Sequence, residues 1–142
     1  MLEAKFPKLR EAGYSLTSPA SPNYNCIAWA AGVVDKWWWP AHIAPYYWPS
    51  DTLRTETVEC FVEAFRLQGY EPCSNDELEL GFEKIALYAA NGLPTHAARQ
   101  LPSGVWTSKL GALQDIEHNT LSALDGTLYG SVVLILRRPL QP

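Results

Sequence analysis

The sequence contains few of the residues that metal sites, disulfide frameworks and nucleic-acid grooves require. It has three cysteines and three histidines among 142 residues, with no Cys-x-x-Cys pair, which argues against a disulfide framework and a structural zinc site. The formal net charge is -4, and basic residues do not cluster beyond Arg137-Arg138, whereas a nucleic-acid groove needs a basic face. The sequence has no glycine-rich phosphate loop or dinucleotide fingerprint. We therefore expect no metal, no cofactor and no nucleic-acid partner.

Long apolar runs and a secretory leader are also missing. No stretch approaches the ~18 apolar residues of a membrane span, and the longest, YGSVVLILRRP, is typical of a buried strand. The opening MLEAKFPKLREAG is charged and lacks the apolar segment of a signal peptide. We therefore expect a cytoplasmic protein without a membrane partner, although a protein exported by a dedicated secretion system would have the same sequence features.

Aromatic residues and prolines are abundant instead. The chain has six Trp, seven Tyr and eleven Pro, and its 47% hydrophobic and 18% charged residues are typical of a globular domain. Residues 1–22 contain the breaks of TSPASP and little periodicity. They predict an extended surface lead-in, followed by a single domain over residues 23–142.

Helices are predicted first along the chain and strands afterwards. Apolar residues at helical spacing predict helices over residues 23–34 and 55–69, and the proline- and aromatic-rich residues 35–51 predict an ordered loop between them. Helices followed by strands indicate an α+β domain, with N-terminal helices packed on an antiparallel sheet. After the second helix, the pattern predicts strands at 83–90, 95–101 and 105–111, an Asn-Gly hairpin turn at 91–92, a short helix at 115–124 and a last strand at 128–139.

The stretch SPNYNCIAWAAG places a cysteine at the start of the first predicted helix. A helix N-terminus favours a thiolate, so Cys26 is the candidate nucleophile, with Asn23 or Asn25 as the helix cap. The alternative is a plain buried thiol, since free cysteine is among the most buried residue types. Cys60 on an amphipathic helix and Cys73 after a proline are interpreted as structural.

A cysteine nucleophile needs a base, which is usually histidine. His96 heads the HAARQL strand and is the best placed of the three, whereas His42 falls in the aromatic loop and His118 on the short predicted helix. A third group should orient the ring of His96 through its second nitrogen. Ser108 and Asp115 are the candidates, and Asp115 offers the stronger acceptor, although it can also serve as an N-cap. His118 is a further possible third member.

An oxyanion at the attacked carbonyl would be stabilised by the side chain of Asn23 or Asn25 together with the backbone N–H of Cys26. Aromatic rings with a polar rim can form a substrate wall, although a tryptophan run can equally serve packing. The predicted substrate-binding residues are Trp37, Trp38, Trp39, Trp48, Trp106 and Arg99.

The order of Cys26 on the first helix, His96 on a strand and a polar residue on the next strand resembles the papain-like superfamily. In size it is most similar to the NlpC/P60-like hydrolases. This resemblance implies a papain-like fold with Cys26 as nucleophile and His96 as base, although the Gly-Ser-Cys-Trp signature of papain is absent. The segments NYNCIAWAAG, WWWP, YWP, GFEKIALYA, THAARQL, WTSKLG and DIEH also resemble an uncharacterised family of small bacterial proteins, over about residues 20–138.

Two functions follow from these residues. The first is a cysteine-dependent hydrolase or acyltransferase acting on an amide bond of a peptide, a protein or a small substrate; by the resemblance, it would suit a bacterial toxin or effector. The second is a catalytically inert binding module, whose aromatic loop at residues 37–48 would contact a protein partner.

Overall fold

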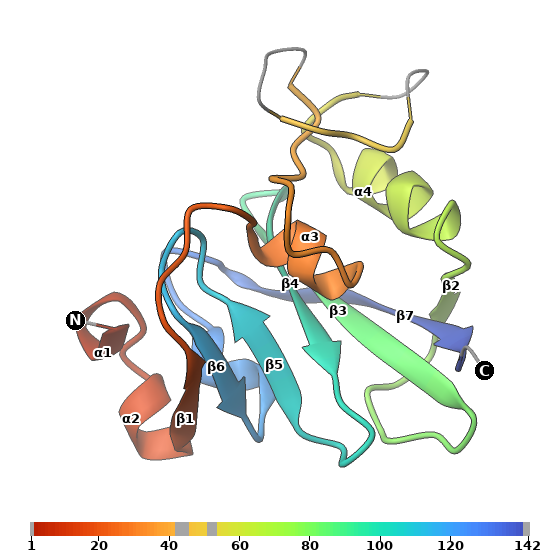
Figure 1. The fold of residues 1–142 in the computed structure, drawn as a ribbon. Helices are drawn as coiled ribbons and strands as arrows, with labels where there is room; N and C mark the ends of the chain where they lie inside the picture. Colours follow the sequence, from red (N-terminus) through yellow and green to blue (C-terminus); the bar gives the residue numbers. More distant parts are fainter. Residues whose placement is uncertain (1, 42–45, 51–53, 141–142) are drawn as a thin grey trace.

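The computed structural model describes residues 2–41, 46–50 and 54–140 of the chain. An antiparallel sheet of seven strands, in the order β1-β6-β5-β4-β3-β7-β2, forms its centre (Figure 1). The strands are β1 (Tyr14–Ser18), β2 (Glu71–Cys73), β3 (Phe82–Ala90), β4 (Leu93–Gln100), β5 (Trp106–Lys109), β6 (Asp115–His118) and β7 (Ser131–Pro139). The helices are α1 (Leu2–Lys5), α2 (Leu9–Ala12), α3 (Cys26–Ala30), α4 (Val58–Arg66) and the 3-10 helix η1 (Leu121–Leu124).

The hairpin of β3 and β4 is confirmed as predicted. The two strands pair in antiparallel register, and they are joined by Asn91 at φ 53° and Gly92 at φ 80°. Both turn residues therefore have the positive φ that a type I′ turn requires, and Asn-Gly is the pair that adopts it most readily. Strand β5 continues this meander next to β4.

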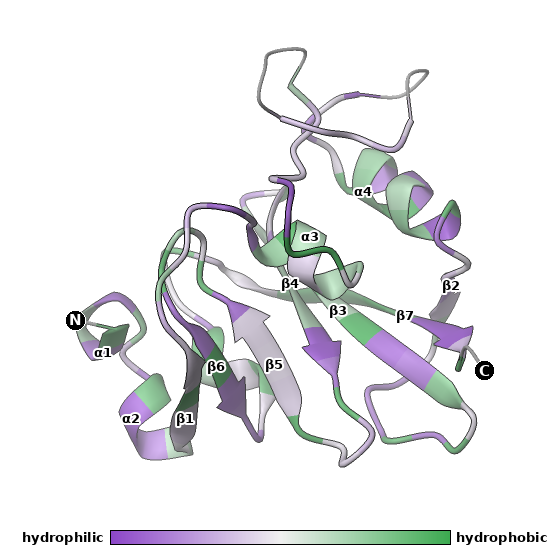
Figure 2. Cartoon of the chain, in the orientation of Figure 1, coloured by the Kyte–Doolittle hydropathy of each residue, from purple (hydrophilic) through white to green (hydrophobic). Residues whose placement is uncertain are grey.

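The sheet separates two hydrophobic cores, because alternate residues of a strand face opposite sides. The first core contains Leu87 and Ala97 together with residues of α3 and α4. The second core contains Tyr88 and Ala98 together with residues of α2 and η1. Figure 1 shows α3 and α4 on the same side of the sheet, and Figure 2 shows that α3 is mostly hydrophobic.

The predicted fold class, a papain-like (NlpC/P60-like) α+β domain with N-terminal helices packed on the sheet, is wrong. The antiparallel sheet is the main element, and the longest helix, α4, has only nine residues. Strand β1 comes from the predicted lead-in, and it pairs with β6 at one edge of the sheet. Within the described ranges, no helix is long and apolar enough to cross a bilayer.

The helix predicted at residues 115–124 is also absent. Residues 115–118 form β6, which pairs with β1 on one side and β5 on the other, and only Leu121–Leu124 turns as a 3-10 helix. The alternation of Asp115, Ile116, Glu117 and His118 suits a strand, because it sends Ile116 into the second core. Tertiary pairing therefore overrides the local signal for a helix cap.

Candidate functional site

Three buried polar side chains from adjacent strands form a hydrogen-bonded chain, which we call the histidine relay. His96 on β4 places Nε2 3.0 Å from Oγ of Ser108 on β5, and this Oγ lies 2.8 Å from Nε2 of His118 on β6. The other ring nitrogen of His118, Nδ1, lies 2.9 Å from the backbone oxygen of Thr120. The exposed fraction of each relay side chain is 0–1%.

The position of Thr120 fixes the protons of the relay. A carbonyl oxygen can only accept, so Nδ1 of His118 donates to it. Burial lowers the pKa of His118, so the ring is neutral at pH 7 and its Nε2 accepts the hydroxyl proton of Ser108. The oxygen of Ser108 must then accept from Nε2–H of His96.

This assignment leaves Nδ1 of His96 as a bare lone pair. Burial, and then the charge of His118, hold the pKa of His96 well below its usual value, so the ring carries a single proton, and that proton is on Nε2. Among the described residues, Nδ1 of His96 is buried and has no hydrogen-bond partner. A buried, unpartnered acceptor is costly to maintain and is what a general base requires.

Cys26 begins α3 and is 95% buried, with 5% of its surface exposed. Burial raises the pKa of its thiol to about 11, while the backbone N–H groups of Ala97, Ile27 and Cys26 itself, together with the charge of Lys109, act to lower it. The thiol is therefore protonated at pH 7. These N–H groups are nevertheless in place to stabilise negative charge on the sulfur when a base removes its proton.

Cys26 and His96 lie on opposite faces of β4 and share two neighbours. Ala97, whose N–H faces the thiol, follows His96 in the chain. Tyr129 lines a pocket beside Cys26, and its ring stacks on His96 with centroids 4.2 Å apart and planes at 9°. No hydrogen bond joins the two side chains in the described part of the chain. The structure thus brings the predicted nucleophile and base into one neighbourhood without direct contact.

The pocket beside Cys26, which we call the aromatic pocket, has a volume of about 260 Å³. Two of the predicted substrate residues, Trp37 and Trp39, form part of its wall. The other described residues that line it are Asn25, Cys26, Tyr46, Thr95, Gly111 and Tyr129.

Asn25 holds the pocket wall and the start of α3 together. Its Oδ1 accepts from the backbone N–H of Ala28, at 3.2 Å, and of Trp38, at 3.0 Å. Its Nδ2 donates to the backbone oxygen of Trp38 at 2.8 Å. Asn25 is therefore the helix cap, and its amide is already engaged, so the geometry does not favour the predicted oxyanion role. The other candidate, Asn23, is exposed and does not line the pocket.

Asp115, the stronger of the two predicted partners for His96, lies elsewhere. Its Oδ2 accepts from the hydroxyl of Tyr24 at 2.7 Å, and burial followed by this hydrogen bond raises the pKa of Tyr24 to about 12. The ammonium of Lys109 lies 4.9 Å from the Tyr24 ring centroid and donates to the backbone oxygen of Ser21 at 2.7 Å. Ser108, the weaker candidate, is the residue that contacts His96.

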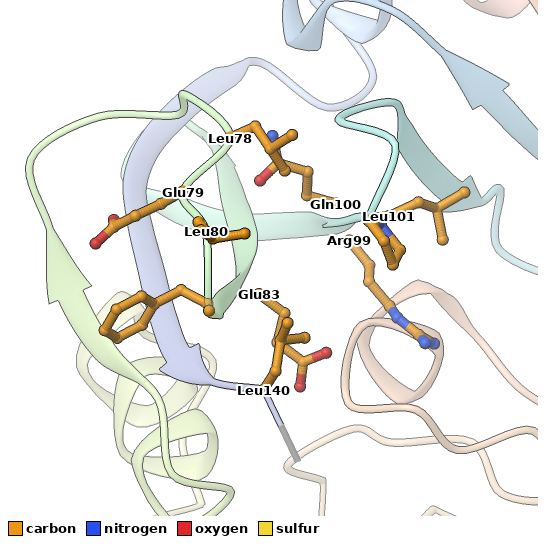
Figure 3. Close-up of a pocket in the computed structure, with 11 residues that line it drawn as sticks. Leu78, Glu79, Leu80, Glu83, Arg99, Gln100, Leu101 and Leu140 are labelled. Carbon is orange, nitrogen blue, oxygen red and sulfur yellow. The ribbon is translucent and has the colours of Figure 1, made fainter. Parts of the chain in front are cut away.

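The remaining predicted substrate residues do not line the aromatic pocket. Trp38 and Trp48 are buried in the first core, and Trp106 is buried in the second. Arg99 lines a separate pocket of about 390 Å³, and its guanidinium lies 5.2 Å from the Trp29 ring centroid. Figure 3 shows this second pocket, with walls that include Leu78, Leu80 and Leu140.

The place of His118 in the site differs from the one that the sequence predicts. His118 was expected on a helix, but it belongs to β6 and completes the relay. Ser108 lies two residues from Trp106, and His118 lies two residues from Ile116, so each polar residue shares a face of its strand with a large apolar residue. This spacing on neighbouring strands is the sequence signal for the role of His118. His42 lies outside the described residues. Within the described ranges, no cluster of three His, Cys, Asp or Glu side chains is arranged to hold a metal ion.

Fold and site together define a small antiparallel-sheet protein with a buried thiol, an aromatic pocket and a histidine relay. A family model described as "Domain of unknown function (DUF7689)" matches residues 15–137, so the chain belongs to this family. Comparisons with curated proteins and with solved structures give no match. The family description carries no activity, and the function must therefore be argued from the site itself.

Proposed function

We propose that this protein is a cysteine-dependent hydrolase or acyltransferase that acts on an amide bond. The observation that carries the proposal is the bare Nδ1 of His96, at the end of a relay whose protons are fixed by Thr120. Two neighbours of His96, Ala97 and Tyr129, also border Cys26. Buried polar atoms usually have a hydrogen-bond partner, and the unpartnered Nδ1 of His96 supports this role.

In the proposed reaction both groups are neutral at rest. As Sγ of Cys26 attacks the carbonyl carbon, a water molecule carries the thiol proton to Nδ1 of His96, because the two side chains lie on opposite sides of β4 without direct contact. The backbone N–H groups around the sulfur stabilise the thiolate as it forms. The C–N bond then breaks, and the imidazolium returns this proton through the same water to the leaving amine. A thioester remains on Cys26. Attack by water completes hydrolysis and attack by an amine completes acyl transfer, and either restores the thiol.

The relay supports the base through its geometry. Ser108 accepts from Nε2–H of His96, which keeps the proton on that nitrogen and the lone pair on Nδ1. When His96 becomes positively charged, the hydroxyl oxygen of Ser108 stabilises the imidazolium. In the proposal Ser108 is therefore the positioning residue, in place of the predicted Asp115.

The test measures alkylation of Cys26 by iodoacetamide, with mass spectrometry distinguishing the three thiols. If His96 acts as the base, His96→Ala lowers the rate at pH 7 by about 10²-fold or more. At pH 10 the rate stays within about twofold, because near the thiol pKa of about 11 the thiolate forms without a base. Tyr88→Phe is the matched control, since it keeps the ring that packs edge-on against His96 and removes only the hydroxyl that donates to the backbone oxygen of Leu121, and it leaves both rates unchanged.

A second readout is transient acylation of Cys26 by p-nitrophenyl acetate, followed by intact mass. The proposal expects a thioester on Cys26 that forms and decays more slowly in the His96→Ala variant. The proposal fails if the alkylation rate at pH 7 is the same in the His96→Ala variant and no acyl adduct appears on Cys26. That outcome would favour the alternative function, a catalytically inert binding module.

A further inference from the structure

The aromatic pocket has an unusual balance of chemical groups. None of the described residues that line it carries a formal charge, and its walls include the rings of Trp37, Trp39 and Tyr129. Lys109 is the cation that influences the Cys26 thiol, but it is buried, it donates to the backbone oxygens of Ser21 and Gly111, and it does not line the pocket. A charged group entering this pocket would thus lose its hydration without gaining a counter-ion.

The non-aromatic polar side chains of the wall are already engaged. The amide of Asn25 bonds to the backbone of Ala28 and Trp38, and the hydroxyl of Thr95 donates to the backbone oxygen of Tyr129 at 2.6 Å. A sugar ring needs several free hydrogen-bonding partners for its hydroxyl groups, and these two side chains retain only the second N–H of Asn25 and the lone pairs of the Thr95 hydroxyl. The pocket therefore favours an apolar ring over a carbohydrate.

The tryptophan walls are held in place before any ligand arrives. The backbone oxygen of Trp37 accepts from N–H of Tyr47 at 2.9 Å, and N–H of Trp39 donates to the oxygen of Tyr47 at 3.0 Å. The ring of Trp39 packs edge-on against Phe61, with centroids 5.4 Å apart. Such preorganised rings can receive another aromatic ring with little loss of entropy.

We propose that the pocket binds an uncharged aromatic acyl group, the ring of which enters between Trp37 and Trp39 while its carbonyl carbon meets Cys26. This substrate class rests on the proposed function. The volume of about 260 Å³ lies just below the roughly 300–1,000 Å³ of sites for drug-sized ligands, so the pocket takes one ring-bearing side chain and leaves the rest of the substrate outside.

The experiment compares three p-nitrophenyl esters that differ only in the acyl group: acetyl, 3-phenylpropionyl and the anionic succinyl. Acylation of Cys26 is followed by intact mass, and each rate is divided by the rate with 2-mercaptoethanol to remove intrinsic reactivity. The phenylpropionyl ester should acylate Cys26 about tenfold or more faster than acetyl, and the succinyl ester should be slower than acetyl.

Two tryptophan variants locate the effect. Trp37→Leu should lower the phenylpropionyl rate by a much larger factor than the acetyl rate, so that most of the preference for phenylpropionyl is lost. Trp29→Leu is the matched control, because Trp29 is a half-buried tryptophan of α3 outside the pocket, and it should keep the preference. Thermal melts confirm that both variants are folded.

A binding measurement separates this inference from the proposed function. Calorimetry with Cys26→Ala protein should detect 3-phenylpropionamide and show at least tenfold weaker binding of butyramide and of 3-phenylpropylammonium. If the amide binds but no ester acylates Cys26 in the unmodified protein, the hydrolase proposal fails and the pocket assignment stands. Equal normalised rates for the three esters, or equal losses for both acyl groups in the Trp37→Leu variant, overturn the aromatic assignment.

Discussion

Mild acid should destabilise the fold through the two histidines of the relay. Burial lowers the folded-state pKa of both His96 and His118, whereas both titrate near 6.5 in the unfolded chain. A group whose pKa is lower in the folded state than in the unfolded state binds more protons when the chain unfolds. For a histidine, this means that the folded protein keeps the ring neutral. Its contribution to stability is therefore complete above about pH 6.5 and is lost as the pH falls below that value.

The size of the loss follows from the linkage relation. A histidine that stays neutral in the fold costs about 1.6 kcal/mol between pH 6.5 and pH 5, because only the unfolded chain gains its proton. His118 contributes less than His96, since its hydrogen bond to Thr120 acts to raise its pKa. The pair together should lower the free energy of unfolding by about 2–3 kcal/mol over this range.

Urea unfolding at steps of half a pH unit measures this loss. The range above pH 5 isolates the histidines, because Glu79, whose pKa is lowered by its bond to Arg137, contributes only at lower pH. His96→Gln should remove the larger part of the pH dependence and His118→Gln the smaller part. A free energy of unfolding that is flat from pH 6.5 to pH 5, or a His96→Gln protein with the full dependence, would refute the buried neutral relay.

Three other changes test the structure around Cys26. Ser108→Ala should lower the free energy of unfolding by about 2–4 kcal/mol in urea, because Nε2 of both relay histidines would lose its partner. Asn25→Ala should cost about 2–3 kcal/mol in the same assay, since it removes a helix cap and two bonds to the backbone of Trp38. Lys109→Met should slow alkylation of Cys26 at pH 9, because the charge of Lys109 lowers the thiol pKa and its loss raises that pKa; an unchanged rate in a folded variant would contradict this.

The parts of the fold that the sequence predicts are those encoded by neighbouring residues. The Asn91-Gly92 turn forms the hairpin because these two residues adopt positive φ, and the apolar stripe of α4 faces the first core. Residues 115–118 escape prediction because their strand conformation depends on pairing with both β1 and β5. Such pairing is a long-range property that no local pattern contains.

The same distinction between local and long-range information applies to the candidate site. The sequence predicts Cys26 as a candidate nucleophile and His96 as a candidate base, and the structure places both beside Ala97 and Tyr129. The third residue is harder to predict, because Asp115, the stronger candidate acceptor, already accepts a hydrogen bond from Tyr24. Only the register of β4, β5 and β6 brings Ser108 between two histidines.

Asn25 forms its hydrogen bonds to Trp38 with the backbone of the tryptophan and not with its side chain. The contact that anchors the loop beside Cys26 therefore does not depend on which side chains flank that position. Residues 37 and 39 can change while the anchor and the start of α3 stay where they are. A substitution at residue 37 or 39 would therefore alter the wall of the aromatic pocket without removing the contact that holds the start of α3.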